Sequence, residues 1–209
     1  GAGLPRLIAE KGLTARLPDA IAASSHFRRL AIKTYLERLR LAGNIAGFEM
    51  LQFADCLKYE NKNGLVDAFD DDRDIDPAWL RQVNDDVVLL ADVDTESGWS
   101  GEPWALRLHL SNYAPQPLGD GTLELHLAAP GQPRQCVYRA DHVSPVAGVS
   151  LLAEVALRPN AATPGAWRLE AELRCGDRVC RNDWILHVFP RRRAAARPAL
   201  RLADAALAD

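Results

Sequence analysis

The spacing of hydrophobic residues changes near position 85, and this change divides the chain into two predicted parts. Before it, apolar residues recur at helical spacing, as Ile32, Leu36 and Leu39 do at i, i+4 and i+7. From Val87 onward, apolar and polar residues alternate, which is typical of strands with one buried face. The predicted domains are an α/β segment (1–84), an all-β segment (85–190), and a linker with the start of a further helix (191–209).

The helical part predicts three helices, over 4–12, 18–23 and 27–41. Ser24 or Ser25 is expected to cap the long third helix, and Gly43 to end it. One face of this helix is strongly charged, which predicts a solvated surface rather than a phosphate or nucleic-acid site. The charged residues are Arg28, Arg29, Lys33, Glu37, Arg38 and Arg40.

The apolar run from Phe48 to Ala54 is too continuous for a strand with one wet face. It predicts a short strand that is covered on both sides, as in the sheet of an α/β fold. The run ends in Asp55, followed by a polar loop and Gly64. Because α/β proteins place ligand contacts just past the carboxyl ends of parallel strands, a small-molecule site is expected near Asp55.

The second part predicts seven short strands separated by turns rich in Gly, Pro, Asn and Asp. Their number and spacing fit an immunoglobulin-like β-sandwich. The expected strands are 87–93, 104–112, 122–128, 135–139, 150–157, 167–173 and 183–189. His109 and His126 fall on the polar faces of their strands, which favours solvated positions over ligand positions. The tryptophans at 104, 167 and 184 are expected in the core rather than on a sugar-stacking platform.

Two clusters of reactive residues suggest chemistry that the spacing does not support. Asp70, Asp72 and Asp74 suggest a calcium loop, but Ile75 and Arg81 stand where such a loop needs glycine and glutamate. We expect a solvated loop that leads into a helix capped by Asp76, with Pro77 first and Trp79 and Leu80 turned inward.

The four cysteines (Cys56, Cys136, Cys175 and Cys180) have no zinc spacing, so no metal site is predicted. Cys175 and Cys180 flank a hairpin turn, which leaves either two buried thiols or a disulfide open.

Composition narrows the class of protein. The 209 residues are 48% hydrophobic and 25% charged, with a formal net charge of −3, as in ordinary soluble globular proteins. This balance gives no general attraction to nucleic acid or to an anionic membrane, and neither partner is expected. We find no signal peptide and no apolar run long enough for a membrane span, so the localisation stays unassigned.

Three segments together resemble the family-two glycoside hydrolases, which include β-galactosidases and β-glucuronidases. They are 47–55, 64–69 and 76–79, and the strands 106–118 and 181–190 add to the resemblance. The resemblance implies the end of a (β/α)8 TIM barrel, containing its last strand and closing helix, followed by an immunoglobulin-like sandwich. This sequence departs from the family at Ala54, where histidine is common, and at 58–62, which lacks a glycine-rich loop.

The resemblance also implies where the chemistry lies. Retaining glycosidases need two carboxyl groups about 5 Å apart, one as proton donor and one as nucleophile. In this family both are glutamates on earlier barrel strands, so no catalytic residue is expected in this chain, neither Glu49 nor Asp55. Asp55, and less strongly Gln52, are the candidates for contacts with sugar hydroxyls. No cofactor is implied.

The leading expectation is therefore a C-terminal fragment of a glycoside hydrolase, inactive alone, whose parent acts on a carbohydrate substrate. An alternative is a non-catalytic carbohydrate-binding module that uses Trp99 or Trp104. Another is an interaction protein that self-associates through an exposed barrel segment.

Overall fold

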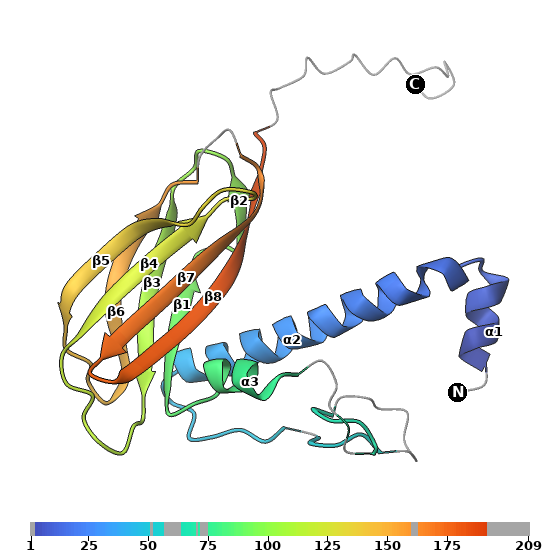
Figure 1. Cartoon of the computed structure of the whole chain (residues 1–209), viewed down its shortest axis with the longest axis horizontal. Coiled ribbons are helices and arrows are strands. Elements are labelled where there is room, and N and C mark those ends of the chain that lie inside the picture. The colour runs from blue at the N-terminus through green and yellow to red at the C-terminus, as the bar shows by residue number, and fades with distance from the viewer. Residues whose placement is uncertain are drawn as a thin grey trace, which may run out of the picture.

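The computed structural model describes residues 3–50, 52–56, 64–69, 71, 75–159 and 163–191. The helices are α1 (Gly3–Glu10), the 3-10 helix η1 (Thr14–Arg16), α2 (Leu17–Leu41) and α3 (Pro77–Val83). The strands are β1 (Val87–Val93), β2 (Ser97–Trp99), β3 (Trp104–Asn112), β4 (Gly121–Ala128), β5 (Gln135–Val143), β6 (Gly148–Leu157), β7 (Gly165–Cys175) and β8 (Arg178–Phe189). The described chain is therefore rich in β-structure, with helices before the strands (Figure 1).

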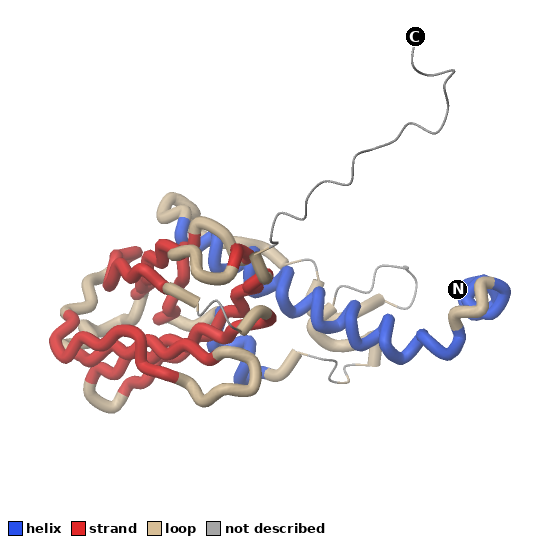
Figure 2. Tube along the Cα trace, turned by 90° about the horizontal axis from the view of Figure 1, so that it is seen from above, coloured by secondary structure: helices blue, strands red, loops and turns tan. Residues whose placement is uncertain are grey.

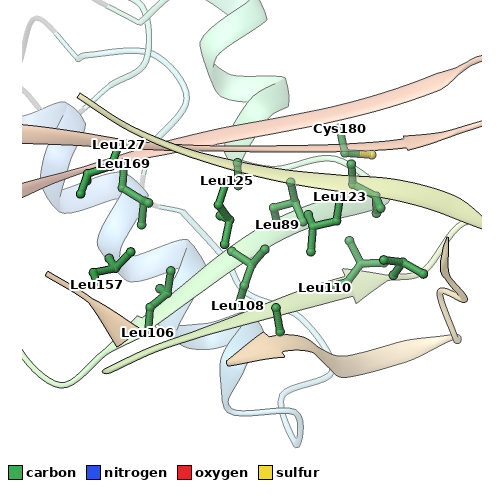
Figure 3. Close-up of a cluster of buried hydrophobic side chains, with 14 of the residues drawn as sticks. Leu89, Leu106, Leu108, Leu110, Leu123, Leu125, Leu127, Leu157, Leu169 and Cys180 are labelled. Carbon is green, nitrogen blue, oxygen red and sulfur yellow. The ribbon is translucent and has the colours of Figure 1, made fainter. Parts of the chain in front are cut away.

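The strands form two sheets that enclose one core. One sheet has the order β1-β3-β6, and the other has the order β2-β8-β7-β4-β5. All neighbours are antiparallel except β2 and β8, which are parallel. Leucines from both sheets meet between them, among them Leu89, Leu108 and Leu125, each with an exposed fraction of 0% (Figure 3). Face-to-face sheets with alternating inward leucines are the arrangement of a β-sandwich.

All seven predicted strands are present, and two have the predicted bounds. β1 and β3 match the prediction residue for residue, whereas β4 to β8 are each longer than predicted. The short β2 was missed because its three residues, Ser97 to Trp99, carry no alternation that sequence periodicity could detect. Trp104 and Trp167 lie in the core as predicted, with 4% and 6% exposed.

The helical prediction needs one correction. α2 runs without a break from Leu17 to Leu41, so Ser24 and Ser25 lie inside it and do not cap it. Pro18 stands in the first turn of the helix. The N–H groups of that turn have no partner within the helix, so the missing N–H of a proline costs nothing there. The prediction for α3 is confirmed, because the Asp76 carboxylate accepts a hydrogen bond from the Ala78 amide at 2.8 Å.

The predicted covered strand from Phe48 to Ala54 is not formed by those of its residues that the structure describes, and the described chain contains no barrel. Residues 44–50 have no regular secondary structure, and Phe48 and Phe53 are 40% and 69% exposed. A strand that is covered on both faces needs paired neighbours, because its buried N–H and C=O groups must find partners. Among the described residues, the segment forms only one isolated parallel bridge, between Ala54 and Val66.

The end of α2 is packed on the sandwich, and its beginning projects away from it (Figures 1 and 2). On the sandwich side, Leu36 and Val83 are buried, with 1% and 0% exposed. Val88 and Leu90 are also buried, although they point away from the core between the sheets. α2 and α3 thus add a small second core outside β1.

Among the described helices, none is both long enough and apolar enough to cross a bilayer. The solvated loop that was expected in place of a calcium site includes Asp70, Asp72 and Asp74, which lie outside the described residues.

Candidate functional site

Asp55 closes the base of the loop that follows the apolar run. Its side chain is buried, and its Oδ1 accepts a hydrogen bond from the Gly64 amide at 2.8 Å. The backbone reinforces this closure, because Asp55 donates to the Val66 carbonyl at 3.2 Å and Leu65 donates to the Phe53 carbonyl at 2.7 Å. Two of the three segments that carry the family resemblance are therefore joined side by side in the structure.

Glycine is required at position 64 by this close approach. A Cβ there would lie 2.5 Å from the Asp55 nitrogen and 2.6 Å from the Val66 oxygen. These are backbone atoms, which cannot move aside without breaking the bridge. Arg28 of α2 also donates to the Gly64 carbonyl, so the helix holds the loop base as well.

Gln52 lies three residues before Asp55 and is half-buried. Its Nε2 is shielded from solvent and has no hydrogen-bond partner among the described residues. A buried amide donor without a partner costs free energy, about 1 to 3 kcal/mol in general. Such a donor suits a ligand oxygen, and this property distinguishes Gln52 from Asp55, whose carboxylate already closes the loop.

A second group of polar residues joins α2 to the sandwich, and sequence reasoning missed it. The carboxylate of Glu37, with 6% of the residue exposed, accepts hydrogen bonds from Asn182 Nδ2 at 2.7 Å and from Trp184 Nε1 at 2.9 Å. Lys33 donates to both Glu37 and Asn182. Asn182 also donates to the Leu89 carbonyl at 2.7 Å.

The predicted solvated face of α2 is therefore wrong at these positions. Glu37 is buried and Lys33 is half-buried against β8, and Arg40 donates to the Ser111 hydroxyl at 3.0 Å and to the Asp85 carbonyl at 2.8 Å. Burial lowers the pKa of Lys33, and its ion pair with Glu37 opposes that shift. The i, i+4 spacing of Lys33 and Glu37 was the one available signal, but it is equally common on exposed helices.

A groove of about 570 Å³ runs beside this polar cluster, between α2 and the sandwich edge where β1 and β8 meet. Trp79 of α3 and Trp184 of β8 stand in its walls. Each indole carries a cation on one face, Arg29 over Trp79 at 4.9 Å and Lys33 over Trp184 at 5.0 Å. Trp184 thus belongs to the junction as well as to the edge of the predicted core.

The remaining candidate residues, the cysteines and His109, have no assigned function in the described structure. In the described part of the chain, no three His, Cys, Asp or Glu side chains are placed to hold a metal ion. Cys175 and Cys180 are buried free thiols, and burial raises the pKa of each, which keeps them protonated. His109 is half-buried rather than solvated, and its Nε2 is shielded without a partner in the described structure.

Comparisons with known proteins give only weak likenesses in structure. No protein-family model and no curated protein matches this chain. A β-glucuronidase from Parabacteroides merdae is 12% identical with a TM-score of 0.36, and the match covers 49% of this chain and 13% of that one. The CARDB domain of the PF1109 protein from Pyrococcus furiosus is 12% identical with a TM-score of 0.35, covering 50% and 88%. Spo0M, a sporulation control protein from Bacillus subtilis, is 11% identical with a TM-score of 0.35, covering 52% and 51%.

These neighbours differ in function, and each likeness covers about half of this chain. The chain spans a small share of the β-glucuronidase that it resembles.

Proposed function

We propose that this chain is the C-terminal part of a glycoside hydrolase of family two, a class of enzyme that hydrolyses O-glycosyl bonds in carbohydrate metabolism. The two catalytic glutamates then lie elsewhere in the parent protein, and the sandwich supports the barrel that carries them. The basis of this proposal is the sequence resemblance over 47–55, 64–69 and 76–79.

The structural observation that supports it is an uncovered apolar surface before the sandwich. Large apolar side chains on α2 and on the segment after it are 37% to 72% exposed. They are Leu17, Ile21, Phe27, Leu30, Tyr35, Ile45, Phe48, Phe53 and Phe69. Soluble proteins rarely leave such a surface open, and the remaining strands and helices of a barrel would cover it. In that setting we expect 48–54 to become the covered strand that the sequence predicts.

Within the parent's site, we assign Gln52 as a hydrogen-bond donor to a sugar hydroxyl and Asp55 as the residue that holds the adjoining loop. The unpartnered Nε2 of Gln52 supports the first assignment, and the bond from Gly64 to Asp55 supports the second. A sugar oxygen would then satisfy the buried amide, which favours binding of the correct ligand.

The test compares this chain with the longer natural polypeptide that contains it. Chromogenic β-galactosides and β-glucuronides are the substrates, and we expect turnover by the longer polypeptide and none by this chain. Hydrolysis by the purified 209-residue chain, or no glycosidase activity in the longer polypeptide, would overturn the proposal. In the active polypeptide, Gln52→Ala should raise KM more than it lowers kcat, whereas Gln132→Ala, in an exposed turn, should change neither.

A second candidate function is carbohydrate binding by the sandwich itself, and the structure restricts it to one tryptophan. Trp104 is buried, but Trp99 is 46% exposed and meets Phe189 edge to face with ring centroids 6.2 Å apart. An exposed indole of this kind can stack on a sugar ring. Soluble glycans should then quench tryptophan fluorescence, and Trp99→Ala should abolish the quenching. Equal quenching in the variant would reject this function.

A further inference from the structure

The groove beside α2 contains the free edge of a β-strand. β1 has one neighbour in its sheet, β3, and among the described strands no second one pairs with it. The Tyr113 amide donates to the Asp86 carbonyl, and these two residues are directly opposite in the register that continues β1 and β3. Hydrogen-bonded pairs alternate along an antiparallel ladder. The backbone groups of 88, 90 and 92 therefore face β3, and those of 87, 89, 91 and 93 face the free edge.

The carbonyl of Leu89, one of the groups that face the free edge, already has a partner outside β3, which agrees with the direction given by the register. Asn182 Nδ2 donates to the Leu89 carbonyl. Farther along the same edge, Ala91 and Val93 line the groove. Their N–H and C=O groups are directed into a channel bounded by α2, and their side chains pack partly against the sandwich core. This combination of an open strand edge and an apolar floor is what an added strand requires.

The charges around the groove favour a negatively charged partner. On α2, Arg38 is exposed and has no ion-pair partner among the described residues, and Arg29 and His26 lie along the same wall. The carboxylates facing them are already engaged, because Glu37 is bound by Lys33, and Asp183 by Gln82 and Arg168. Glu96, beyond the end of β1, is the one acidic side chain of the lining that has no ion-pair partner among the described residues. The helix side of the groove is therefore basic.

We propose that the groove binds an extended acidic peptide segment, which adds to the free edge of β1 as a further strand. Its backbone pairs with the outward groups of Ala91 and Val93. Its apolar side chains face the floor made with Leu186, and its carboxylates face Arg38 and Arg29. This proposal is separate from the glycosidase proposal and does not depend on it.

The experiment uses the whole 209-residue chain and a dye-labelled nine-residue peptide in which valine and glutamate alternate. Fluorescence anisotropy measures binding, and a peptide of alternating valine and lysine is the control ligand. Ala91→Pro removes an N–H that faces the groove and leaves the ladder to β3 intact. The matched control is Ala156→Pro on β6, at the other edge of the same sheet, where the register with β3 likewise directs the N–H outward.

We expect Ala91→Pro to weaken binding about tenfold or more, because the backbone pairing is lost, and Ala156→Pro to stay within about twofold of the unchanged chain. Arg38→Glu should also weaken binding of the acidic peptide, whereas Arg16→Glu, near the start of α2, should not. Circular dichroism of each variant shows that it is folded. The proposal is overturned if the lysine peptide binds as tightly, if the two proline variants bind alike, or if no binding occurs at millimolar peptide.

Discussion

At the scale of single residues, Glu37 makes the strongest individual link between α2 and the sandwich. Its carboxylate is bound by Asn182 and Trp184 from β8 and by Lys33 from its own helix. Breaking a buried ion pair leaves the other charge and its donors without partners, which is far more costly than losing an exposed pair. The link therefore sets the position of the helix, and through Arg28 it also bears on the loop base at Gly64.

We predict that Glu37→Ala lowers the free energy of unfolding by about 3 kcal/mol. The matched control is Glu10→Ala, which removes an exposed i, i+4 pair with Arg6 and should cost less than about 0.5 kcal/mol. Urea unfolding followed by tryptophan fluorescence measures both. Equal costs for the two variants would show that the Glu37 cluster does not hold the helix.

His109 is expected to affect how the stability of the folded chain changes at acidic pH. Burial lowers the pKa of His109 below its ordinary value of 6.5, and the nearby Asp92 opposes the shift. Because the unfolded chain binds the proton more readily, the contribution of His109 is present above pH 6.5 and is lost as pH falls through the folded-state pKa. His109→Gln should therefore flatten the loss of stability as the pH falls below 6.5. Thermal unfolding at a series of pH values below 6.5 tests this prediction, and a variant that loses stability as steeply as the unchanged chain would contradict it.

Sequence reasoning at this scale succeeded where the cause is local and failed where it is not. The Asp76 cap depends on the backbone two residues away, so the Asp-Pro pair was sufficient to predict it. The burial of Lys33 depends on Asn182 and Trp184, which are about 150 positions farther along the chain. No local pattern contains that information.

At the scale of elements, strands whose pattern is local were predicted correctly, whereas the predicted strand that depends on distant elements is not formed. β3 and β4 alternate along most of their length between buried residues and more exposed ones, and this period can be read from the sequence of each strand. The run from Phe48 to Ala54 has no such period, and its prediction required covering elements on both sides. Only Val66 pairs with it among the described residues, so it stays irregular.

The loop base at Gly64 gives a prediction for this segment. Gly64→Ala should open the bridge between Ala54 and Val66, because the new Cβ would overlap backbone atoms on both sides. Amide hydrogen exchange at Asp55 and Leu65 should become faster, while the sandwich strands keep their protection. Gly47→Ala is the control, since a Cβ there meets nothing within 4 Å. Unchanged exchange at Asp55 in the Gly64 variant would contradict the close approach.

At the scale of the whole molecule, the chain has one well-covered half and one open half. The two sheets bury a continuous leucine core (Figure 3). In contrast, the N-terminal half of α2 and the segments around Phe48, Phe53 and Phe69 expose large apolar side chains. The polar cluster at Glu37 fixes the helix to the sandwich at one end only. The N-terminal half of α2 is therefore open to a covering element, and the proposed barrel would be that element.

Without that cover, the open half is expected to bind itself, and this gives a prediction for the isolated chain. Light scattering of the 209-residue chain should give a mass above the monomer that rises with concentration, because association removes the exposed aromatic side chains from water. Replacing Phe27, Phe53 and Phe69 with glutamine should return the mass toward that of the monomer. The control replaces Tyr113, Leu151 and Phe189, which are 59%, 50% and 51% exposed on the sandwich, and should leave association unchanged. A strictly monomeric starting chain would show that the open half stays solvated, and equal effects of the two triple variants would show that association does not depend on the open half.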